Sequence, residues 1–176
     1  ENTELLKTKN IIIATGSMPI DIAVAEVDNK NIVDSTGALE FKAVPKTLGI
    51  IGAGIIGLEL GSVWSRLGSK VTILEAMDDF LPMADSKISD DVLKEFNKQG
   101  LNINLGCKVT AAKSNEKNVT VNFQNNGDKS ELTFDKLIVA VGRKPYTNNL
   151  FDESCGLSVD QNGFISVNDF CETPIK

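Results

Sequence analysis

The chain reads LGIIGAGIIGLELGSVWSRLGSKVTILE from Leu48 to Glu75, and this stretch decides the expected fold. It opens with four apolar residues that are typical of a buried strand. Gly52, Gly54 and Gly57 follow directly, in the order Gly-x-Gly-x-x-Gly. A glycine triplet that follows a strand and opens a helix is the fingerprint of a dinucleotide-binding turn.

Each glycine of the triplet has a separate expected role. Gly52 makes the tight turn from strand to helix, and Gly54 removes a side chain where backbone must approach a pyrophosphate. Gly57 lets the helix pack closely on the sheet. The free N–H groups at the start of the helix then face the phosphates.

The residues after the triplet complete the fingerprint. Gly68 is the expected end of the helix, and Val71 to Leu74 form the next strand, which Glu75 closes. A carboxylate at this position accepts hydrogen bonds from a ribose 2′-hydroxyl and repels a 2′-phosphate, and no arginine follows nearby. The sequence therefore favours NAD over NADP as the ligand.

Composition excludes several other classes of function. The 176 residues are 41% hydrophobic and 24% charged, with a net charge of −6, so the chain would not attract a nucleic acid. No apolar run approaches the roughly 20 residues of a membrane span, and the N-terminus has no signal-peptide pattern, so we expect no membrane association and a cytoplasmic location. The three cysteines are widely spaced and histidine is absent, which indicates neither a disulfide framework nor a metal site.

The segments around the fingerprint extend the α/β pattern. The apolar run Asn10 to Ala14 predicts a strand buried on both faces, and Ser35 is the expected cap of a short helix through Leu39. Further along, Asp85 or Ser86 is expected to cap a helix that ends at Gly100. Its apolar face is expected to carry Ile88, Val92 and Phe96, and Trp64 and Arg66 of the preceding helix are expected to be a packing and a surface residue.

Strands dominate the second half of the chain. Leu101 to Leu105 is expected to continue the parallel sheet, and Lys136 to Val141 is a further buried strand that ends at Gly142. Three segments between them mix apolar and polar residues and predict an antiparallel meander with a turn at Asn125-Asn126-Gly127. These segments are Val109 to Lys113, Val119 to Phe123 and Glu131 to Phe134. The tail from Tyr146 is rich in loops, with a pair of short strands expected around Gly163.

The order of elements predicts a doubly wound, Rossmann-like α/β fold with a parallel sheet and an inserted antiparallel meander. Ligands of such sheets bind at the carboxyl ends of the strands. Gly52, Glu75, the region around Val109 and Gly142 should therefore line one edge of the sheet.

Four segments together resemble a known family. They are ATGS at Ala14 to Ser17, DSTGAL from Asp34, VPKTLGIIGAGIIGLELGSVWSRLGSKVTILE from Val44, and VAVGRKPYTNNL from Val139. The chain is similar over essentially its whole length to the flavin-dependent pyridine nucleotide disulfide oxidoreductases, and within them to the dihydrolipoamide dehydrogenases. The resemblance implies a homodimeric flavoenzyme that oxidises protein-bound dihydrolipoamide on 2-oxoacid dehydrogenase complexes, and passes electrons through a disulfide and FAD to NAD.

The resemblance also assigns roles to individual residues. It implies that Gly52 to Glu59 bind the pyrophosphate, that Glu75 binds the adenosine ribose, and that Val109 and Gly142 contact NAD. The full set of expected cofactor contacts is Gly52, Ala53, Gly54, Ile55, Ile56, Gly57, Leu58, Glu59, Glu75, Val109 and Gly142, with Thr15, Gly16 and Ser17 beside FAD. Glu59 is expected to reach the nicotinamide end; the alternative is an acidic residue that complements the helix dipole.

Some elements of the family pattern are missing from this sequence. It has no FAD fingerprint at its N-terminus, no Cys-x-x-x-x-Cys pair and no histidine. We therefore expect the central part of a longer enzyme, with no catalytic residues of its own and no activity alone. The expected division is an end of the FAD domain with a linker at 1–43, the NAD-binding domain at 44–143, and an incomplete return to the FAD domain at 144–176.

Two alternatives stay open at this point. The chain could be a non-catalytic NAD-binding module. It could also be the NAD domain of another flavin disulfide reductase, of the mercuric reductase or transhydrogenase type.

Overall fold

The computed structural model describes residues 4–175, which divide into two compact units. One unit runs from Pro19 to Gly142, and the other combines the segments before Pro19 and after Gly142. The central unit extends further toward the N-terminus than the expected NAD-binding domain at 44–143. The three-part domain division stays a prediction.

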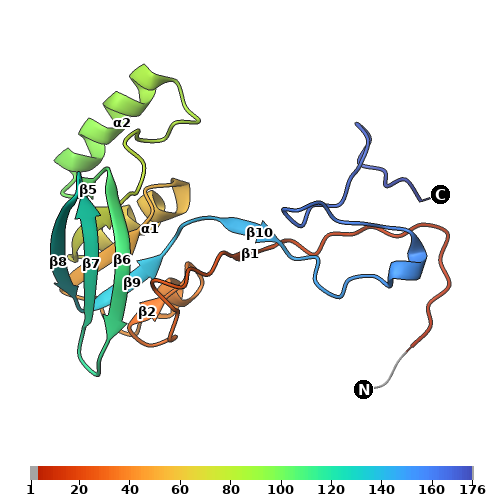
Figure 1. Cartoon of the computed structure of the whole chain (residues 1–176), viewed down its shortest axis with the longest axis horizontal. Coiled ribbons are helices and arrows are strands. Elements are labelled where there is room, and N and C mark those ends of the chain that lie inside the picture. The colour runs from red at the N-terminus through yellow and green to blue at the C-terminus, as the bar shows by residue number, and fades with distance from the viewer. Residues whose placement is uncertain (1–3, 176) are drawn as a thin grey trace. The chain divides into compact units, whose positions relative to one another are not determined.

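The central unit is built on a five-stranded parallel sheet in the order β2-β9-β3-β4-β5 (Figure 1). Its strands are β2 (Ile32–Val33), β3 (Thr47–Ile51), β4 (Lys70–Leu74), β5 (Asn102–Asn104) and β9 (Lys136–Val139). The strands expected at 48–51, 71–74, 101–105 and 136–141 are thus present, with shifted ends. The two-residue strand β2 has no counterpart in the sequence analysis, because it is too short to show a pattern.

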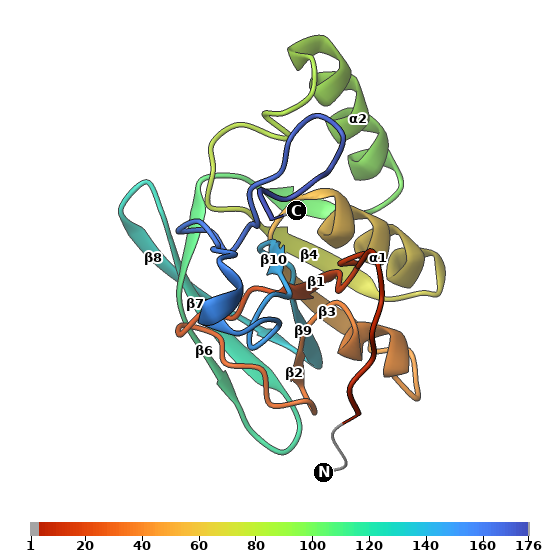
Figure 2. The ribbon, with the colours of Figure 1, turned by 90° about the vertical axis from the view of Figure 1, so that its right-hand side faces the viewer.

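Two helices cover one face of this sheet, and the meander covers the other (Figure 2). The helices are α1 (Ile55–Arg66) and α2 (Ser86–Lys98); the meander consists of β6 (Cys107–Ser114), β7 (Val119–Asn125) and β8 (Asp128–Phe134). Alternate residues of β3 divide between the two cores: Leu48 and Ile50 pack under the helices, and Ile51 packs under the meander. A strand buried on both faces explains the continuous apolar pattern.

The meander has the expected turn. β7 ends at Asn125 and β8 begins at Asp128, so Asn126 and Gly127 form a two-residue hairpin loop. Both have positive φ, 50° and 91°, as a type I′ turn requires.

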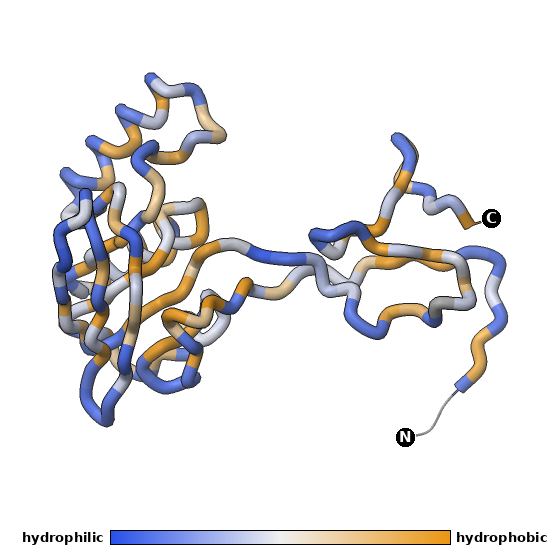
Figure 3. Tube along the Cα trace, in the orientation of Figure 1, coloured by the Kyte–Doolittle hydropathy of each residue, from blue (hydrophilic) through white to orange (hydrophobic). Residues whose placement is uncertain are grey.

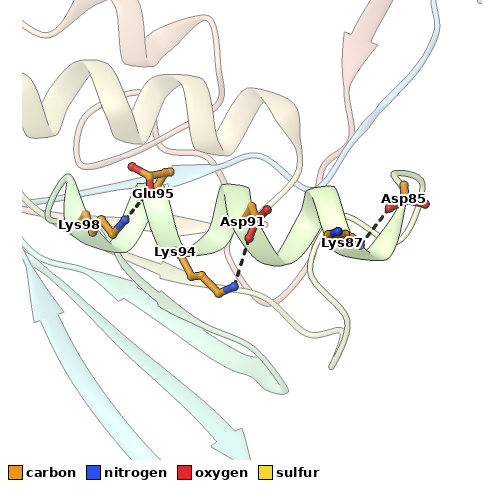
Figure 4. Close-up of polar contacts among 6 residues, drawn as sticks. All are labelled: Asp85, Lys87, Asp91, Lys94, Glu95 and Lys98. Atoms are coloured by element: carbon orange, nitrogen blue, oxygen red, sulfur yellow. Dashed lines mark hydrogen bonds and ion pairs between the residues drawn. The ribbon is translucent and has the colours of Figure 1, made fainter.

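The ends of both helices agree with the sequence in most respects. Gly68, at φ 108°, follows α1, and Asp85 caps α2 by accepting a hydrogen bond from the Lys87 N–H (Figure 4). Trp64 is buried against Phe41, and Arg66 is exposed, as expected. Ile88 was expected on the packed face of α2 but is 60% exposed, because Ser89, one position on, is the residue that turns inward.

The short helix after β2 is capped differently from the expectation. The 3-10 helix η1 (Gly37–Glu40) begins after Thr36, and the Asp34 carboxylate accepts hydrogen bonds from the N–H groups of Thr36 and Gly37. The prediction of Ser35 as the cap was therefore wrong. Asp34 takes the role because its carboxylate reaches amides two and three residues ahead.

The other unit contains little regular structure. β1 (Ser17–Pro19) pairs with β10 (Arg143–Pro145), a single bridge joins Val159 and Ile165, and η2 covers Glu153–Cys155. A pair of short strands was expected around Gly163, and this bridge is the part of it that the structure contains. The colouring in Figure 3 shows the change along the chain from apolar β9 to hydrophilic β10.

The strand predicted at Asn10 to Ala14 was wrong. The segment has no regular structure, and Ile11 and Ile12 are 80% and 90% exposed. A run of isoleucines has strong β propensity, but a strand also needs a neighbour with which to pair, and none of the described strands lies beside it.

None of the helices in residues 4–175 is long and apolar enough to span a bilayer.

Candidate functional site

The glycine turn between β3 and α1 forms the centre of the candidate site. Gly52 has φ 103°, and a Cβ there would lie 2.5 Å from the carbonyl oxygen of Ala140. A Cβ at Gly57 would collide with the carbonyl oxygen of Gly52. Both glycines are therefore required by the fold itself, the first by the turn and the second by helix packing.

Gly54 differs from the other two glycines. It has an ordinary extended conformation, φ −73° and ψ 176°, and a Cβ there would meet nothing within 4 Å. Neither backbone strain nor packing requires glycine at this position. The open space above Gly54 is what a ligand that approaches the backbone would need.

The start of α1 offers free hydrogen-bond donors beside Gly54. Gly54 is the N-cap residue and has no side chain to cap the helix; the first intrahelical bond joins the Leu58 N–H to the Gly54 oxygen at 3.0 Å. The N–H groups of the residues before Leu58 precede this ladder and have no intrahelical acceptor. Together with the helix dipole, such donors favour an anion.

Glu75 lies at the end of β4 and contacts the glycine turn directly. Its Oε2 accepts a hydrogen bond from the Ala53 N–H at 2.7 Å, and its Oε1 accepts one from the Met77 N–H at 2.9 Å. The main chain of Glu75 is also fixed, because its N–H donates to Asn104 and its carbonyl accepts from the Cys107 N–H. The structure thus places the two halves of the fingerprint in contact.

The predicted residues Ile55, Ile56, Leu58 and Glu59 all lie on the first turns of α1. Leu58 is buried and Ile56 half-buried, so both pack on the sheet. Ile55 is 58% exposed, and Glu59, also exposed, lies one helical turn further on the same face. The effect of the helix dipole is strongest in the first turn of a helix, and Glu59 is the fifth residue of α1, beyond that turn. The position of Glu59 therefore gives little support to the alternative that it complements the dipole.

Val109 and Gly142 are the other predicted contacts in the central unit. Val109, on β6, is 8% exposed and packs in the core between the meander and the sheet. Gly142 is exposed with φ 132°, and its carbonyl accepts a hydrogen bond from the Ile20 N–H.

Thr15, Gly16 and Ser17 belong to the other compact unit and are exposed. The Gly16 carbonyl accepts a hydrogen bond from the Tyr146 N–H, and Ser17 accepts one from the Arg143 guanidinium through its hydroxyl at 2.8 Å. The structure therefore brings Gly52 to Glu59 and Glu75 together, and the ATGS turn is part of a separate unit.

The sequence did not predict two residues, Met77 and Asn125, that form hydrogen bonds near the carboxyl ends of β4 and β5. The Met77 N–H supports the Glu75 carboxylate, and the Asn125 amide donates to the Leu105 carbonyl at 3.2 Å and to the Cys107 sulfur at 3.1 Å. No local pattern indicates either contact. Among the described residues no cluster of cysteine, aspartate and glutamate side chains forms a metal site, and the three cysteines are free.

Comparison with known proteins identifies the chain's relatives. All 176 residues match the family model described as pyridine nucleotide-disulphide oxidoreductase. The chain is 48% identical to a dihydrolipoyl dehydrogenase of Cupriavidus necator over 98% of its own length and 36% of the relative's, and 42% identical to the mitochondrial dihydrolipoyl dehydrogenase of Bos taurus over 99% and 35%. It thus spans about a third of the length of these relatives.

A solved structure gives the same result. The HOCl-induced flavoprotein disulfide reductase RclA from Escherichia coli, in its Cu(II) complex, matches with a TM-score of 0.82 and 34% identity over 92% of this chain and 36% of that chain. The match covers the Rossmann-like fold described above. The chain belongs to the pyridine nucleotide-disulphide oxidoreductase family.

Proposed function

We propose that this chain is the NAD-binding region of a dihydrolipoamide dehydrogenase. The observation that carries the proposal is the open space at Gly54, where glycine is unnecessary for the fold but lies beside the free amides of α1. The relatives named dihydrolipoyl dehydrogenase favour this member of the family over the mercuric reductase and transhydrogenase types.

The described residues fit the proposed ligand. The amides at the start of α1 would hold the pyrophosphate, and the Glu75 carboxylate would accept hydrogen bonds from the adenosine ribose. Glu75 favours NAD over NADP, because a carboxylate repels a 2′-phosphate. Val109 and Gly142 are proposed as further contacts, and the exposed face of α1 at Ile55 and Glu59 as the side toward the nicotinamide. When bound, NAD supplies the acceptor for a hydride.

The proposal extends to the whole enzyme. In it, FAD would contact Thr15, Gly16 and Ser17, the enzyme would be a cytoplasmic homodimer, and its partners would be lipoyl-bearing subunits of a 2-oxoacid dehydrogenase complex. No observation favours the alternative of a free NAD-binding module with no catalysis.

Substitution of Gly54 tests the proposed site. Gly54→Val should weaken the binding of NADH at least about tenfold, because its side chain enters the space that the pyrophosphate needs. The melting temperature should stay close to that of the wild type, since nothing lies within 4 Å of a Cβ there.

Calorimetric titration with NADH, combined with thermal unfolding, checks both parts of this expectation. Gly68→Ala is a matched control, since a Cβ at Gly68 also meets nothing within 4 Å, but its φ of 108° predicts lost stability with retained binding. Unchanged NADH affinity in Gly54→Val would refute the proposed site.

A further inference from the structure

Both oxygens of the Glu75 carboxylate accept hydrogen bonds from backbone amides of the chain. The Ala53 N–H donates to Oε2 at 2.7 Å, and the Met77 N–H donates to Oε1 at 2.9 Å. Ala53 lies in the turn before α1, and Met77 lies in the loop after β4. One side chain therefore ties two strand-end loops together.

The Glu75 carboxylate is the hydrogen-bond acceptor on which the Ala53 N–H depends. Ala53 is 2% exposed, so water has little access to it. The neighbouring amide of Gly52 donates to the Leu74 carbonyl at 2.9 Å, which is the last main-chain bond of the β3–β4 ladder before the turn. Without the Glu75 carboxylate, the Ala53 N–H would be buried and unpaired, which costs free energy.

This bond restrains the turn next to α1. The N–H of Ala53 belongs to the peptide that joins Gly52, at φ 103°, to Ala53. A peptide held at this point restricts the conformations of the turn that leads to the donors at the start of α1. The Ala53 N–H already donates to Glu75, so the N–H groups that can bind an anion are those of residues 54–57.

We propose that Glu75 is a positioning residue for the glycine turn: its carboxylate holds the Ala53 peptide and so helps to aim the amides of residues 54–57. The inference rests on the proposed function in one respect, that these amides bind a pyrophosphate. It goes beyond the role of ribose acceptor, because it gives Glu75 an indirect role in binding the phosphates, which the Glu75 side chain itself would not contact.

Two nucleotides separate this role from that of a ribose acceptor. ADP carries the ribose hydroxyls, and 2′,3′-dideoxy-ADP lacks them. If Glu75 were only an acceptor, Glu75→Ala would weaken ADP and leave the affinity for dideoxy-ADP unchanged. If Glu75 positions the turn, Glu75→Ala should weaken the binding of dideoxy-ADP as well, by at least about tenfold, the lower end of the value of one lost hydrogen bond to a charged group.

Amide hydrogen exchange tests the same idea with no ligand present. In the wild type the Ala53 amide should exchange slowly, and in Glu75→Ala it should exchange at least about tenfold faster. Glu75→Gln should lie between them, because its amide has one oxygen acceptor for two N–H groups and its nitrogen donates. Glu59→Ala, on the exposed face of α1, is the matched control and should leave Ala53 exchange unchanged.

The outcomes decide the proposal separately from the proposed function. Equal affinity of wild type and Glu75→Ala for dideoxy-ADP, or equal Ala53 exchange rates in folded variants, would overturn the positioning role. If Glu75→Ala does not fold, the positioning role is tested by comparing the exchange rate of the Ala53 amide in Glu75→Gln with that in Glu59→Ala. If the wild type binds neither NADH nor ADP, the proposed function fails, while the exchange rates still test whether Glu75 holds the turn.

Discussion

Gly52 and Gly54 lie two residues apart, and different constraints act on them. At Gly52 the constraint is internal, because φ is 103° and the Ala140 carbonyl leaves no room for a Cβ. At Gly54 no internal constraint exists. The fingerprint therefore combines residues that the fold requires with one that only a ligand would require.

Glu75→Arg should change the choice of cofactor. The substitution replaces an acceptor for the ribose hydroxyl by a cation that can pair with a 2′-phosphate. Lost hydrogen bonds should cost about 1 to 3 kcal/mol of NADH binding free energy. The bond to the Ala53 N–H is lost too, so NADPH affinity should rise less than NADH affinity falls.

Titration of both nucleotides into wild type and variant gives the ratio of affinities. Glu116→Arg, at an exposed position with no proposed role in the site, is the control for the added charge, since it leaves Glu75 intact. An unchanged NADH to NADPH ratio in Glu75→Arg would show that the carboxylate does not read the ribose.

Among the secondary-structure elements, α2 shows how a polar helix is held in place. Its outer face carries ion pairs between Asp91 and Lys94 at 3.2 Å and between Glu95 and Lys98 at 2.6 Å, all well exposed (Figure 4). Exposed pairs of this kind contribute little. The Asp85 cap should contribute more, because it satisfies an amide that has no intrahelical partner.

Asp85→Ala should lower the free energy of unfolding by about 1 kcal/mol. Asp91→Ala, which removes one exposed ion pair on the same helix, should lower it by less than about 0.5 kcal/mol. Urea unfolding followed by circular dichroism measures both values. Equal losses in the two variants would contradict a capping role for Asp85.

The loop before β2 should make stability depend on pH. The Asp28 Oδ1 accepts hydrogen bonds from the N–H groups of Lys30, Asn31 and Ile32 at 2.8 to 2.9 Å. Burial raises the pKa of Asp28, but these three bonds and a further one with the Ser114 side chain outweigh it, and the pKa lies below the ordinary value of 3.8. A depressed pKa stabilises the fold above pH 3.8, and this contribution is lost as pH falls through the folded-state pKa.

Asp28→Asn removes the charge and keeps an oxygen acceptor. Its free energy of unfolding should be below that of the wild type at neutral pH, and the gap should narrow as the pH falls below 3.8. Urea unfolding over a series of pH values gives the gap directly. A gap that is constant with pH would mean that the ionised form of Asp28 contributes nothing.

For the whole molecule, we expect the 176-residue chain to bind NADH without reducing NAD in the presence of dihydrolipoamide. Electron transfer from a dithiol needs a redox disulfide and a flavin, and among the described residues Cys107 is buried while Cys155 and Cys171 are exposed and unpaired. Absorbance of NADH, followed with and without an added intact flavoprotein of the family, tests this. Lipoamide-dependent NAD reduction by the purified chain alone would contradict it.

The sequence by itself determined the features that depend on local backbone chemistry. The glycine turn and the Asn126-Gly127 hairpin follow from residues that restrict φ and ψ. The sequence narrowed the cap of α2 to Asp85 or Ser86, and the structure shows that it is Asp85. The parallel sheet follows from continuous apolar runs. Gly52, Gly54, Gly57 and Glu75 were proposed for the candidate site from the glycine fingerprint, and the other site residues from the family resemblance.

Only the tertiary structure decided what depends on partners distant in the sequence. The exposure of Ile11 and Ile12 against their β propensity, the pairing of β2 with β9, the burial of Val109 and the bond from Ala53 to Glu75 are all of this kind. A local pattern states what a segment prefers, but a strand or a buried carboxylate is stabilised by a neighbour. Which neighbour comes within hydrogen-bond distance is determined when the chain packs.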